Sequence, residues 1–136
     1  MSFDVKDWLA RWSPGSGPTT GADVAALYTE NGERWDPGID SRLLGRESIA
    51  AFVQGFLDAV PDGVLSSRSV IRSGDDIAVD WTWKGTHTGD LKGWPADGQP
   101  VVLHGSTILE TSGDLIAQEI AYWDAEELYS GRATGE

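Results

Sequence analysis

His104 is the residue in this sequence whose chemistry best suits proton transfer at neutral pH. An imidazole titrates at about pH 6.5, so a neutral histidine that faces a cavity can exchange protons with a bound molecule. Strand alternation places His104 on one face with Val102, Ser106 and Ile108. Gly105 beside it leaves room for an approaching group, which favours a catalytic role. The alternative is a structural histidine that bonds a backbone carbonyl or faces a dimer partner.

Asp124 is the second candidate for acid/base chemistry. It directly follows a strand-like segment, and alternation places it on the face of Ile120 and Tyr122. A carboxylate among aromatic rings loses part of its hydration and becomes a better base, as removal of a proton beside a carbonyl requires. The same position suits an aspartate that caps a helix at residues 125–128. Spacing alone leaves the two roles open.

Tryptophan is frequent in this chain, with seven residues, and three of them predict a ligand site. Trp81 and Trp83 fall on the same face of a predicted strand, and Trp94 lies in a glycine- and proline-rich loop above the expected mouth of a cavity. Aromatic rings stack on flat molecules, so these residues predict a small apolar or aromatic ligand. Alternatively, Trp81 and Trp83 pack a dimer interface.

Three further side chains are predicted to contact the ligand: Trp35, Tyr122 and His87. The setting of His87, Gly-Thr-His-Thr-Gly, is equally typical of a loop residue that bonds locally. The two histidines of the chain form no HxH or HxxxH pair, and cysteine is absent. We therefore expect no metal site and no cofactor.

The clearest element that could position these residues is a long helix after Gly45. Its single apolar stripe consists of Ile49, Phe52, Val53, Phe56, Leu57 and Val60. A Pro-Asp-Gly sequence at residues 61–63 ends it. Before it, the pattern predicts a helix over residues 3–12, a second short helix that ends near residues 31–32, and a short strand at 33–36.

Four strands are predicted after the long helix, at residues 64–72, 77–86, 101–109 and 115–123. A short acidic helix at residues 124–129 follows them. Helices followed by an antiparallel meander indicate the α+β class, with a curved antiparallel sheet wrapped around the long helix as a cone-shaped α+β barrel. The open end of such a cone is a natural ligand pocket. We expect residues 1–136 to form a single domain.

The charge balance excludes two classes of partner. Acidic residues outnumber basic ones by 22 to 10, which gives a net charge of −12. Nucleic acids and anionic membranes repel such a surface, so we expect neither as a partner. Charged residues interrupt the first 12 positions, and no apolar run approaches the roughly 18 residues of a membrane span. A cytoplasmic location is expected.

Several short segments occur along the chain in an order and at a spacing that can be compared with known families. They are Leu-Tyr at 27–28, Trp-Asp-Pro at 35–37, Gly-Arg-Glu-Ser-Ile at 45–49, Gly-Thr-His-Thr-Gly at 85–89, Gly-Trp-Pro-Ala-Asp-Gly at 93–98 and Tyr-Trp-Asp at 122–124. No single segment is specific, but together they cover nearly all of the chain from about residue 23 to residue 128. Jointly they resemble the SnoaL-like polyketide cyclases of the nuclear transport factor 2-like superfamily.

This resemblance implies a cone with a deep apolar cavity and a homodimer formed through the outer face of the sheet. In the cyclases, an aspartate on the last strand acts as acid and base in an intramolecular aldol closure, and a histidine on the preceding strand assists. The resemblance assigns these roles to Asp124 and His104. It implies a cofactor-independent enzyme that performs aldol cyclisation, isomerisation or related carbon–carbon chemistry on a small aromatic carbonyl compound.

Two other functions remain open, because one fold hosts many activities. The first is a non-catalytic module of the same fold that binds a small ligand or forms a dimeric interaction surface. The second is a hydrolase or lyase that uses an activated water. The binding module would keep the apolar cavity but would not need the pair formed by His104 and Asp124. The hydrolase or lyase would need Asp124 and a second polar residue in the cavity.

Overall fold

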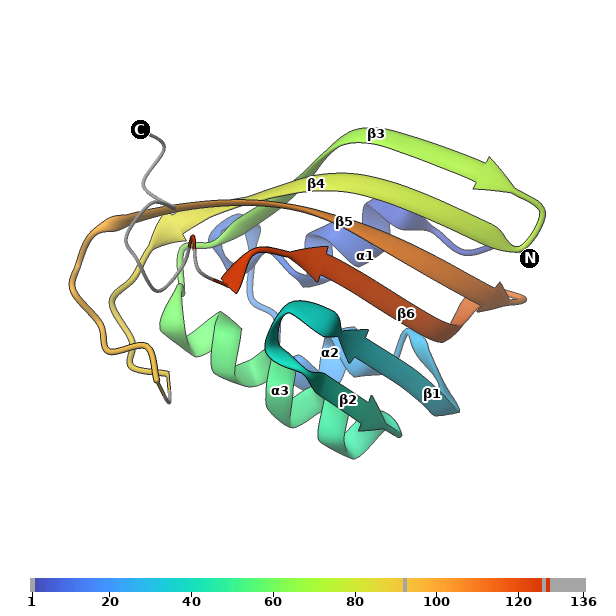
Figure 1. Ribbon diagram of the computed structural model, residues 1–136, viewed down its shortest axis with the longest axis horizontal. Coiled ribbons are helices and arrows are strands. Elements are labelled where there is room, and N and C mark those ends of the chain that lie inside the picture. Colours follow the sequence, from blue (N-terminus) through green and yellow to red (C-terminus); the bar gives the residue numbers. More distant parts are fainter. Residues whose placement is uncertain (1, 92, 126, 128–136) are drawn as a thin grey trace.

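The helices of the protein lie against a single curved sheet, as the computed structural model of residues 2–91, 93–125 and 127 shows (Figure 1). The helices are α1 Val5–Arg11, α2 Gly21–Ala25 and α3 Arg46–Ala59, with short 3-10 turns at Pro14–Ser16 and Pro37–Ile39. The strands are β1 Tyr28–Asp36, β2 Ser41–Leu44, β3 Val64–Ser73, β4 Asp76–Thr86, β5 Pro100–Ser112 and β6 Leu115–Trp123. This confirms the α+β class. Among the described residues, no helix is both long and apolar enough to cross a membrane.

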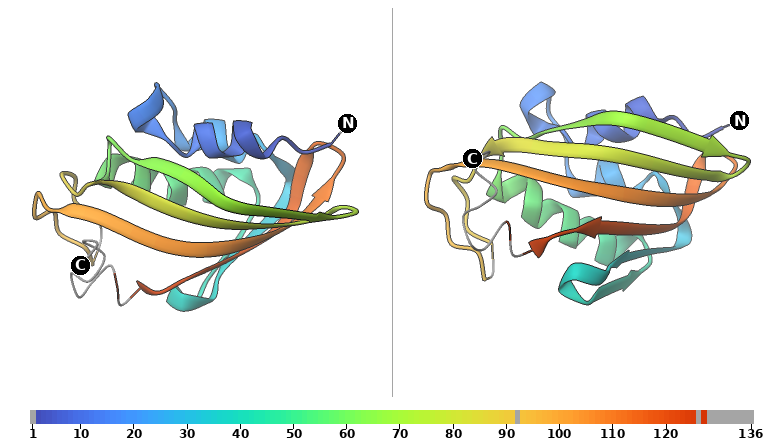
Figure 2. Two further views of the ribbon diagram at one scale, coloured as in Figure 1. Left: turned by 90° about the horizontal axis from the view of Figure 1, so that it is seen from above. Right: turned by 45° about the horizontal axis from the view of Figure 1, so that its top comes forward.

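The sheet contains one pairing that the sequence analysis did not predict. Its strand order in the described ranges is β2-β1-β6-β5-β4-β3, and the pairs from β3 to β6 are antiparallel, as in the predicted meander. β1, however, runs parallel to β6, as their arrowheads in Figure 1 show, and Figure 2 shows the curvature of the sheet in two further views. Local sequence patterns cannot give this pairing, because most of the chain separates the two strands and they meet only through the packing of the whole domain.

α3 has the predicted apolar stripe and buries it in the core. Ile49, Val53 and Leu57 on that stripe are almost fully buried. The short helix α2 packs closely on α3 at Gly21, where a side-chain carbon would come within 2.1 Å of the Ala50 carbonyl oxygen. Glycine is therefore required at this contact, through which α2 packs against α3 at Ala50 and Gln54.

α1 begins at an aspartate cap and closes the other side of the core. The Asp4 carboxylate accepts hydrogen bonds from two backbone N–H groups of the first turn, at 3.0 and 3.2 Å, and so pairs donors that a helix start leaves unpaired. At the far end, Ser13 Oγ accepts from the Leu65 N–H at 2.8 Å, which ties the helix to β3. These two ends fix the segment that carries Trp8 and Trp12.

Two predicted elements have different extents in the structure. The second helix ends early, and Tyr28 already begins β1, which runs on through Asn31 and Gly32 to Asp36. The Asn-Gly pair expected to end a helix instead lies at an irregularity where the register of β1 against β6 shifts. The predicted helix at residues 124–129 lies largely outside the described residues.

Candidate functional site

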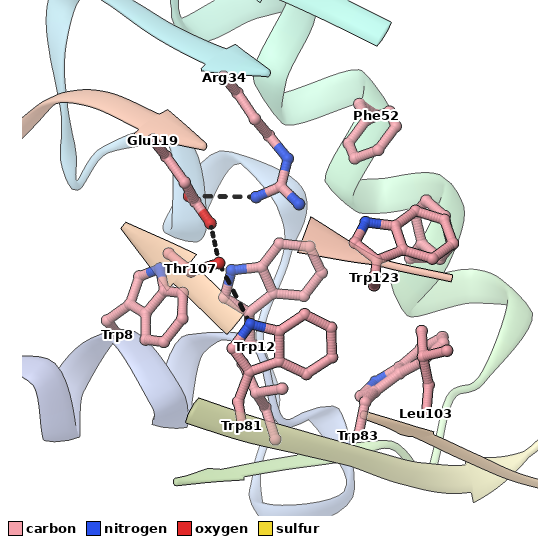
Figure 3. Close-up of a pocket in the computed structure, with 12 residues that line it drawn as sticks. Trp8, Trp12, Arg34, Phe52, Trp81, Trp83, Leu103, Thr107, Glu119 and Trp123 are labelled. Carbon is pink, nitrogen blue, oxygen red and sulfur yellow. Dashed lines mark hydrogen bonds and ion pairs between the residues drawn. The ribbon is translucent and has the colours of Figure 1, made fainter. Parts of the chain in front are cut away.

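An aromatic pocket lies between α1, α3 and the concave face of the sheet (Figure 3). It is lined by Trp8, Trp12, Arg34, Phe52, Phe56, Leu65, Trp81, Trp83, Leu103, Thr107, Glu119 and Trp123. Seven of these twelve residues are aromatic, and the charged or hydroxyl groups come from Arg34, Thr107 and Glu119. Such a lining suits a flat, apolar ligand that carries few polar groups.

Trp81 and Trp83 project from β4 into this pocket. From the sequence, two alternatives were open for these residues, a cavity wall or a dimer interface. In the structure, both residues line the cavity. Trp81 lies against its cross-strand partner Gly105, where a side-chain carbon would be 2.2 Å from the indole ring. Phe56 meets Trp83 edge-on at a centroid distance of 5.8 Å. The aromatic walls are thus packed on one another and on the sheet backbone.

A buried ion pair joins the two parallel strands at the polar end of the pocket. Arg34 in β1 and Glu119 in β6 are register partners, and Arg34 Nη1 lies 3.1 Å from Glu119 Oε1. On its other edge, Arg34 donates from Nε and Nη2 to the two oxygens of Asp36, each at 2.9 Å. Trp123 Nε1 also donates to Asp36, at 2.9 Å. One cation therefore serves two buried carboxylates, and the three groups together have a formal charge of −1.

Hydroxyl groups extend this ion pair into a chain of hydrogen bonds. The Tyr28 hydroxyl donates to Glu119 Oε1, and Thr107 Oγ1 donates to Glu119 Oε2 at 3.0 Å. Trp81 Nε1 in turn donates to Thr107 Oγ1 at 3.1 Å (Figure 3). These hydrogen bonds connect the aromatic wall on β4 with the carboxylate on β6, so a displacement of Trp81 would change the hydrogen bonding of Glu119.

Burial and neighbouring charges fix the protonation states of Arg34 and Tyr28. Burial lowers the pKa of Arg34, but the attraction of Glu119 and Asp36 outweighs it and holds that pKa well above its usual value. Burial raises the pKa of the Tyr28 phenol, and the charge of Glu119 raises it further, against the opposing effect of Arg34. Arg34 is therefore a permanent cation, and Tyr28 is a neutral hydroxyl donor throughout the neutral range.

The polar end of the pocket keeps one acceptor and one donor for a ligand. A carboxylate oxygen has two lone pairs. Within the described part of the protein, Glu119 Oε1 receives both Tyr28 and Arg34, whereas Oε2 receives Thr107 alone. Arg34 Nη2 carries two hydrogens, and Asp36 accepts one of them. Since Glu119 and Arg34 both line the pocket, the remaining lone pair and the remaining N–H can meet a bound molecule.

His104 lies on the outer face of the sheet, so the prediction that it faces the cavity is wrong. It is exposed, and its Nδ1 lies 3.0 Å from the Oγ1 of its cross-strand neighbour Thr82. Ile108 shares that outer face, as alternation predicts, but the opposite face, which carries Leu103 and Thr107, lines the pocket. Both faces of this strand hold apolar residues, so the pattern could not show which face is buried.

Tyr122 and Trp35 do not line the pocket either, contrary to the prediction. Tyr122 is 47% exposed on the outer face of β6. Trp35 is half-buried, and the Arg42 guanidinium lies 3.9 Å from the centroid of its ring. Asp124 is exposed just beyond the end of β6, where its carbonyl oxygen accepts from the Glu127 N–H at 3.1 Å. Asp124 is outside the pocket lining, and its acid/base role stays a prediction.

His87 and Trp94 form a buried stack behind the pocket. Their ring centroids are 3.5 Å apart with an interplanar angle of 25°, and Trp94 contacts Trp83, which does line the pocket. The backbone of His87 pairs with Gln99 and Gly98 across the loop. Neither side chain reaches the cavity, so both support its wall and hold the loop in place.

The polar residues of the pocket, Arg34, Thr107 and Glu119, are ones that the sequence analysis missed. All three lie on the same strands as nominated residues but in the opposite phase: Arg34 precedes Trp35, for example. Alternation was therefore a usable signal for β1, β5 and β6. Alternation alone does not show which face of a strand is concave. The aromatic side chains of Trp35 and Tyr122 favoured the phase that the structure places outside the pocket.

The sequence profile of the SnoaL-like polyketide cyclases matches residues 17–130. The chain belongs to this family. The match includes the strands that carry Arg34, Thr107 and Glu119, and it begins after α1, so Trp8 and Trp12 lie outside it. No curated protein sequence is significantly similar to the chain.

Solved structures share the fold over nearly the whole chain. A protein of Catenulispora acidiphila with a ketosteroid isomerase-like fold, in complex with trimethylamine, has 20% identity and a TM-score of 0.78, over 96% of this chain and 91% of that one. AclR of Streptomyces galilaeus, a candidate hydroxylase, has 18% identity and a TM-score of 0.76, over 95% and 91%. A SnoaL-like polyketide cyclase candidate from Jannaschia has 21% identity and a TM-score of 0.76, over 96% and 90%. At such identities, these likenesses show the fold.

Proposed function

We propose that this protein is a cofactor-independent acid/base enzyme of the cyclase or isomerase type, which removes a proton from the carbon beside a carbonyl. The observation that carries the proposal is the placement of Glu119 beside Arg34 in an otherwise aromatic pocket. Membership of the SnoaL-like polyketide cyclase family supports this reaction class. Glu119 takes the role that the sequence analysis gave to His104 and Asp124.

The proposed reaction uses the open acceptor of Glu119 and the open donor of Arg34 at the polar end of the pocket. The C–H bond breaks, its proton moves to Glu119 Oε2, and its electron pair moves to the carbonyl oxygen as an enolate. Arg34 Nη2 donates a hydrogen bond to that oxygen, and the permanent cation stabilises the developing charge. The enolate carbon then attacks a second carbonyl of the same substrate and closes a ring, and Glu119 returns its proton to the alkoxide that forms. If the substrate is an unsaturated ketone, the dienolate instead takes the proton back at another carbon, which moves the double bond.

The shape of the pocket supports a small aromatic substrate. The cavity has a volume of about 50 Å³, between rings contributed by both sides of the core. This small volume disfavours four fused rings, and a ligand of one or two rings would enter it by displacing the aromatic side chains of the wall. Stacking on Trp81 and Trp83 would hold its plane, while the carbonyl meets the polar end at Arg34.

Exchange of α-hydrogen for deuterium tests the proposal. We expect the protein to exchange the α-protons of α-tetralone, a two-ring aryl ketone, in deuterated water faster than buffer does, as followed by proton NMR. Glu119→Gln keeps the size of the side chain and should lower this rate by a factor of about 100 or more. The matched control is Glu110→Gln, because Glu110 is exposed on β5 and should exchange at the wild-type rate. Exchange by Glu119→Gln at the wild-type rate contradicts the proposal.

A non-catalytic binding module is the second candidate, and one observation favours it. Arg34 and Glu119 are register partners that join β1 to β6, so the same ion pair also serves the architecture of the sheet. Binding of α-tetralone without any exchange above buffer would identify such a module. The homodimer and the cytoplasmic location implied earlier stay predictions, and light scattering on the purified protein tests the first.

A further inference from the structure

Trp8 and Trp12 present buried indole N–H groups that have no hydrogen-bond partner among the described residues. Both side chains are more than nine-tenths buried, and both line the pocket. A buried donor without an acceptor is costly, so native proteins leave few of them. Two such donors on one wall of a pocket indicate that a bound molecule supplies the acceptor.

The other indoles of the pocket differ from these two. Trp81 and Trp123 already donate to Thr107 and Asp36. Trp83 Nε1 also has no partner in the described part of the chain, but it faces the backbone at Gly63, where a side-chain carbon would lie 2.9 Å from it. Among the described residues, the unpaired indole donors that a ligand can use are therefore those of Trp8 and Trp12, which form the α1 wall of the pocket.

The acceptors at the polar end do not serve the α1 wall. Figure 3 shows the nitrogen-bearing edges of Trp8 and Trp12 turned toward the side of the pocket that holds Thr107 and Glu119. Thr107 Oγ1 already accepts from Trp81 and donates to Glu119. A ligand oxygen beside Trp8 and Trp12 would accept the hydrogen bonds from their indole N–H groups that Thr107 and Glu119 do not accept.

We propose that the indole N–H groups of Trp8 and Trp12 bind an acceptor oxygen of the ligand, in addition to the oxygen that meets Arg34. The pocket then selects flat aromatic molecules with oxygen acceptors at two edges over the bare hydrocarbon. This inference rests on the proposed function only in taking the same pocket as the ligand site. It requires no catalysis, so binding alone tests it.

The probes are 1,4-naphthoquinone and naphthalene, which have the same two-ring skeleton with and without two carbonyl oxygens. The quinone has no α-proton to lose, so its binding is read separately from turnover, and the chain has no cysteine to which it could add. We expect the quinone to bind more tightly than naphthalene. Its binding should shift the indole Nε1–H signals of Trp8 and Trp12 downfield in nitrogen-15 NMR spectra, and naphthalene should not.

Phenylalanine variants assign those signals and measure each contribution. Trp8→Phe and Trp12→Phe remove the N–H but keep an aromatic face, which for Trp12 also preserves the contact with the Arg34 guanidinium 5.2 Å from its ring centroid. Each variant should lower the preference for the quinone about three- to tenfold, the worth of one hydrogen bond. Trp35→Phe is the control, because it makes the same replacement at a half-buried tryptophan outside the pocket lining and should leave the preference unchanged.

Several outcomes would overturn this inference. They are equal affinity for the two probes, binding of neither, indole signals of the wild type that do not respond to the quinone, or an unchanged preference in both the Trp8 and Trp12 variants. Selective binding of the quinone combined with no α-exchange of α-tetralone would contradict the proposed function and leave the hydrogen-bond assignment intact. The two proposals can therefore fail separately.

Discussion

Arg34 Nη1 lies 3.1 Å from Glu119 Oε1, and the two residues are direct neighbours across the parallel strands β1 and β6. This contact joins the first strand of the fold to the last. It also places a guanidinium and a carboxylate at the polar end of an aromatic pocket. Because both groups are buried, removal of either leaves a charge in the interior without its partner.

We expect Arg34→Met to destabilise the protein by about 3–5 kcal/mol, because it leaves Glu119 and Asp36 buried without their cation. Urea unfolding measures the loss. Arg68→Met is the control: Arg68 pairs with Asp80 on the surface, where an ion pair contributes about 1 kcal/mol or less. Similar losses in the two variants would show that the buried pair has no special weight.

Alkaline pH should weaken the fold through Tyr28. Its pKa is raised in the folded state, whereas the unfolded side chain ionises near its ordinary value of 10.0. Above that pH the unfolded state binds fewer protons than the folded one, so the free energy of unfolding falls by about 1.4 kcal/mol per pH unit until the raised pKa is reached. Below pH 10 this contribution is fully present.

Tyr28→Phe removes that dependence. At neutral pH the variant should be less stable by about 1.5–3 kcal/mol, because Glu119 loses a hydroxyl donor. Above pH 10 the difference between the two proteins should shrink. Urea unfolding at about pH 8 and about pH 11 measures it, and a difference that stays constant over this range would contradict the raised pKa.

Gly105 should control the position of Trp81. In Gly105→Ala the new methyl group would fall 2.2 Å from the indole ring, so Trp81 must move and its bond to Thr107 is strained or lost. We expect a loss of about 1–3 kcal/mol in unfolding free energy and an upfield shift of the Trp81 Nε1–H signal. Ser106→Ala changes the next residue, whose side chain is exposed on the outer face, and should stay within about 0.5 kcal/mol of wild type.

Variants of the two residues first nominated for catalysis separate the competing assignments. His104→Ala should leave α-deuterium exchange of α-tetralone within about twofold of wild type, because His104 lies on the outer face of the sheet. Asp124→Asn should do the same if Glu119 is the base. Loss of exchange in Asp124→Asn, with exchange retained in Glu119→Gln, would return the catalytic role to Asp124.

Much of the fold could be predicted because its signals are local. The apolar stripe of α3 and the Pro-Asp-Gly sequence after it fix a helix wherever it packs. Short turns join β3 to β4 and β5 to β6, and the loop at residues 87–99 joins β4 to β5, so neighbours in sequence became neighbours in the sheet. β1 was harder, since its Asn-Gly pair is typical of a turn but here lies within a strand that joins a distant partner.

The candidate site could be predicted only in part. Trp81 and Trp83 were correctly placed on a common face, and that face lines the pocket. On β5 and β6 the alternation was correct but the faces were exchanged, so His104 and Tyr122 were nominated in place of Thr107 and Glu119. A strand with apolar residues on both faces carries no local sign of which face the helices will cover.

The sequence by itself determined the α+β class, the long helix, the antiparallel meander and an aromatic cavity, because these depend on the periodicity of neighbouring residues. The tertiary structure alone decided that Arg34 meets Glu119 and that Trp8 and Trp12 complete the wall. Those contacts join β1 to β6 and α1 to the sheet across long stretches of chain. They form because the curved sheet closes over the helices, and its concave face buries one phase of β1, β4, β5 and β6.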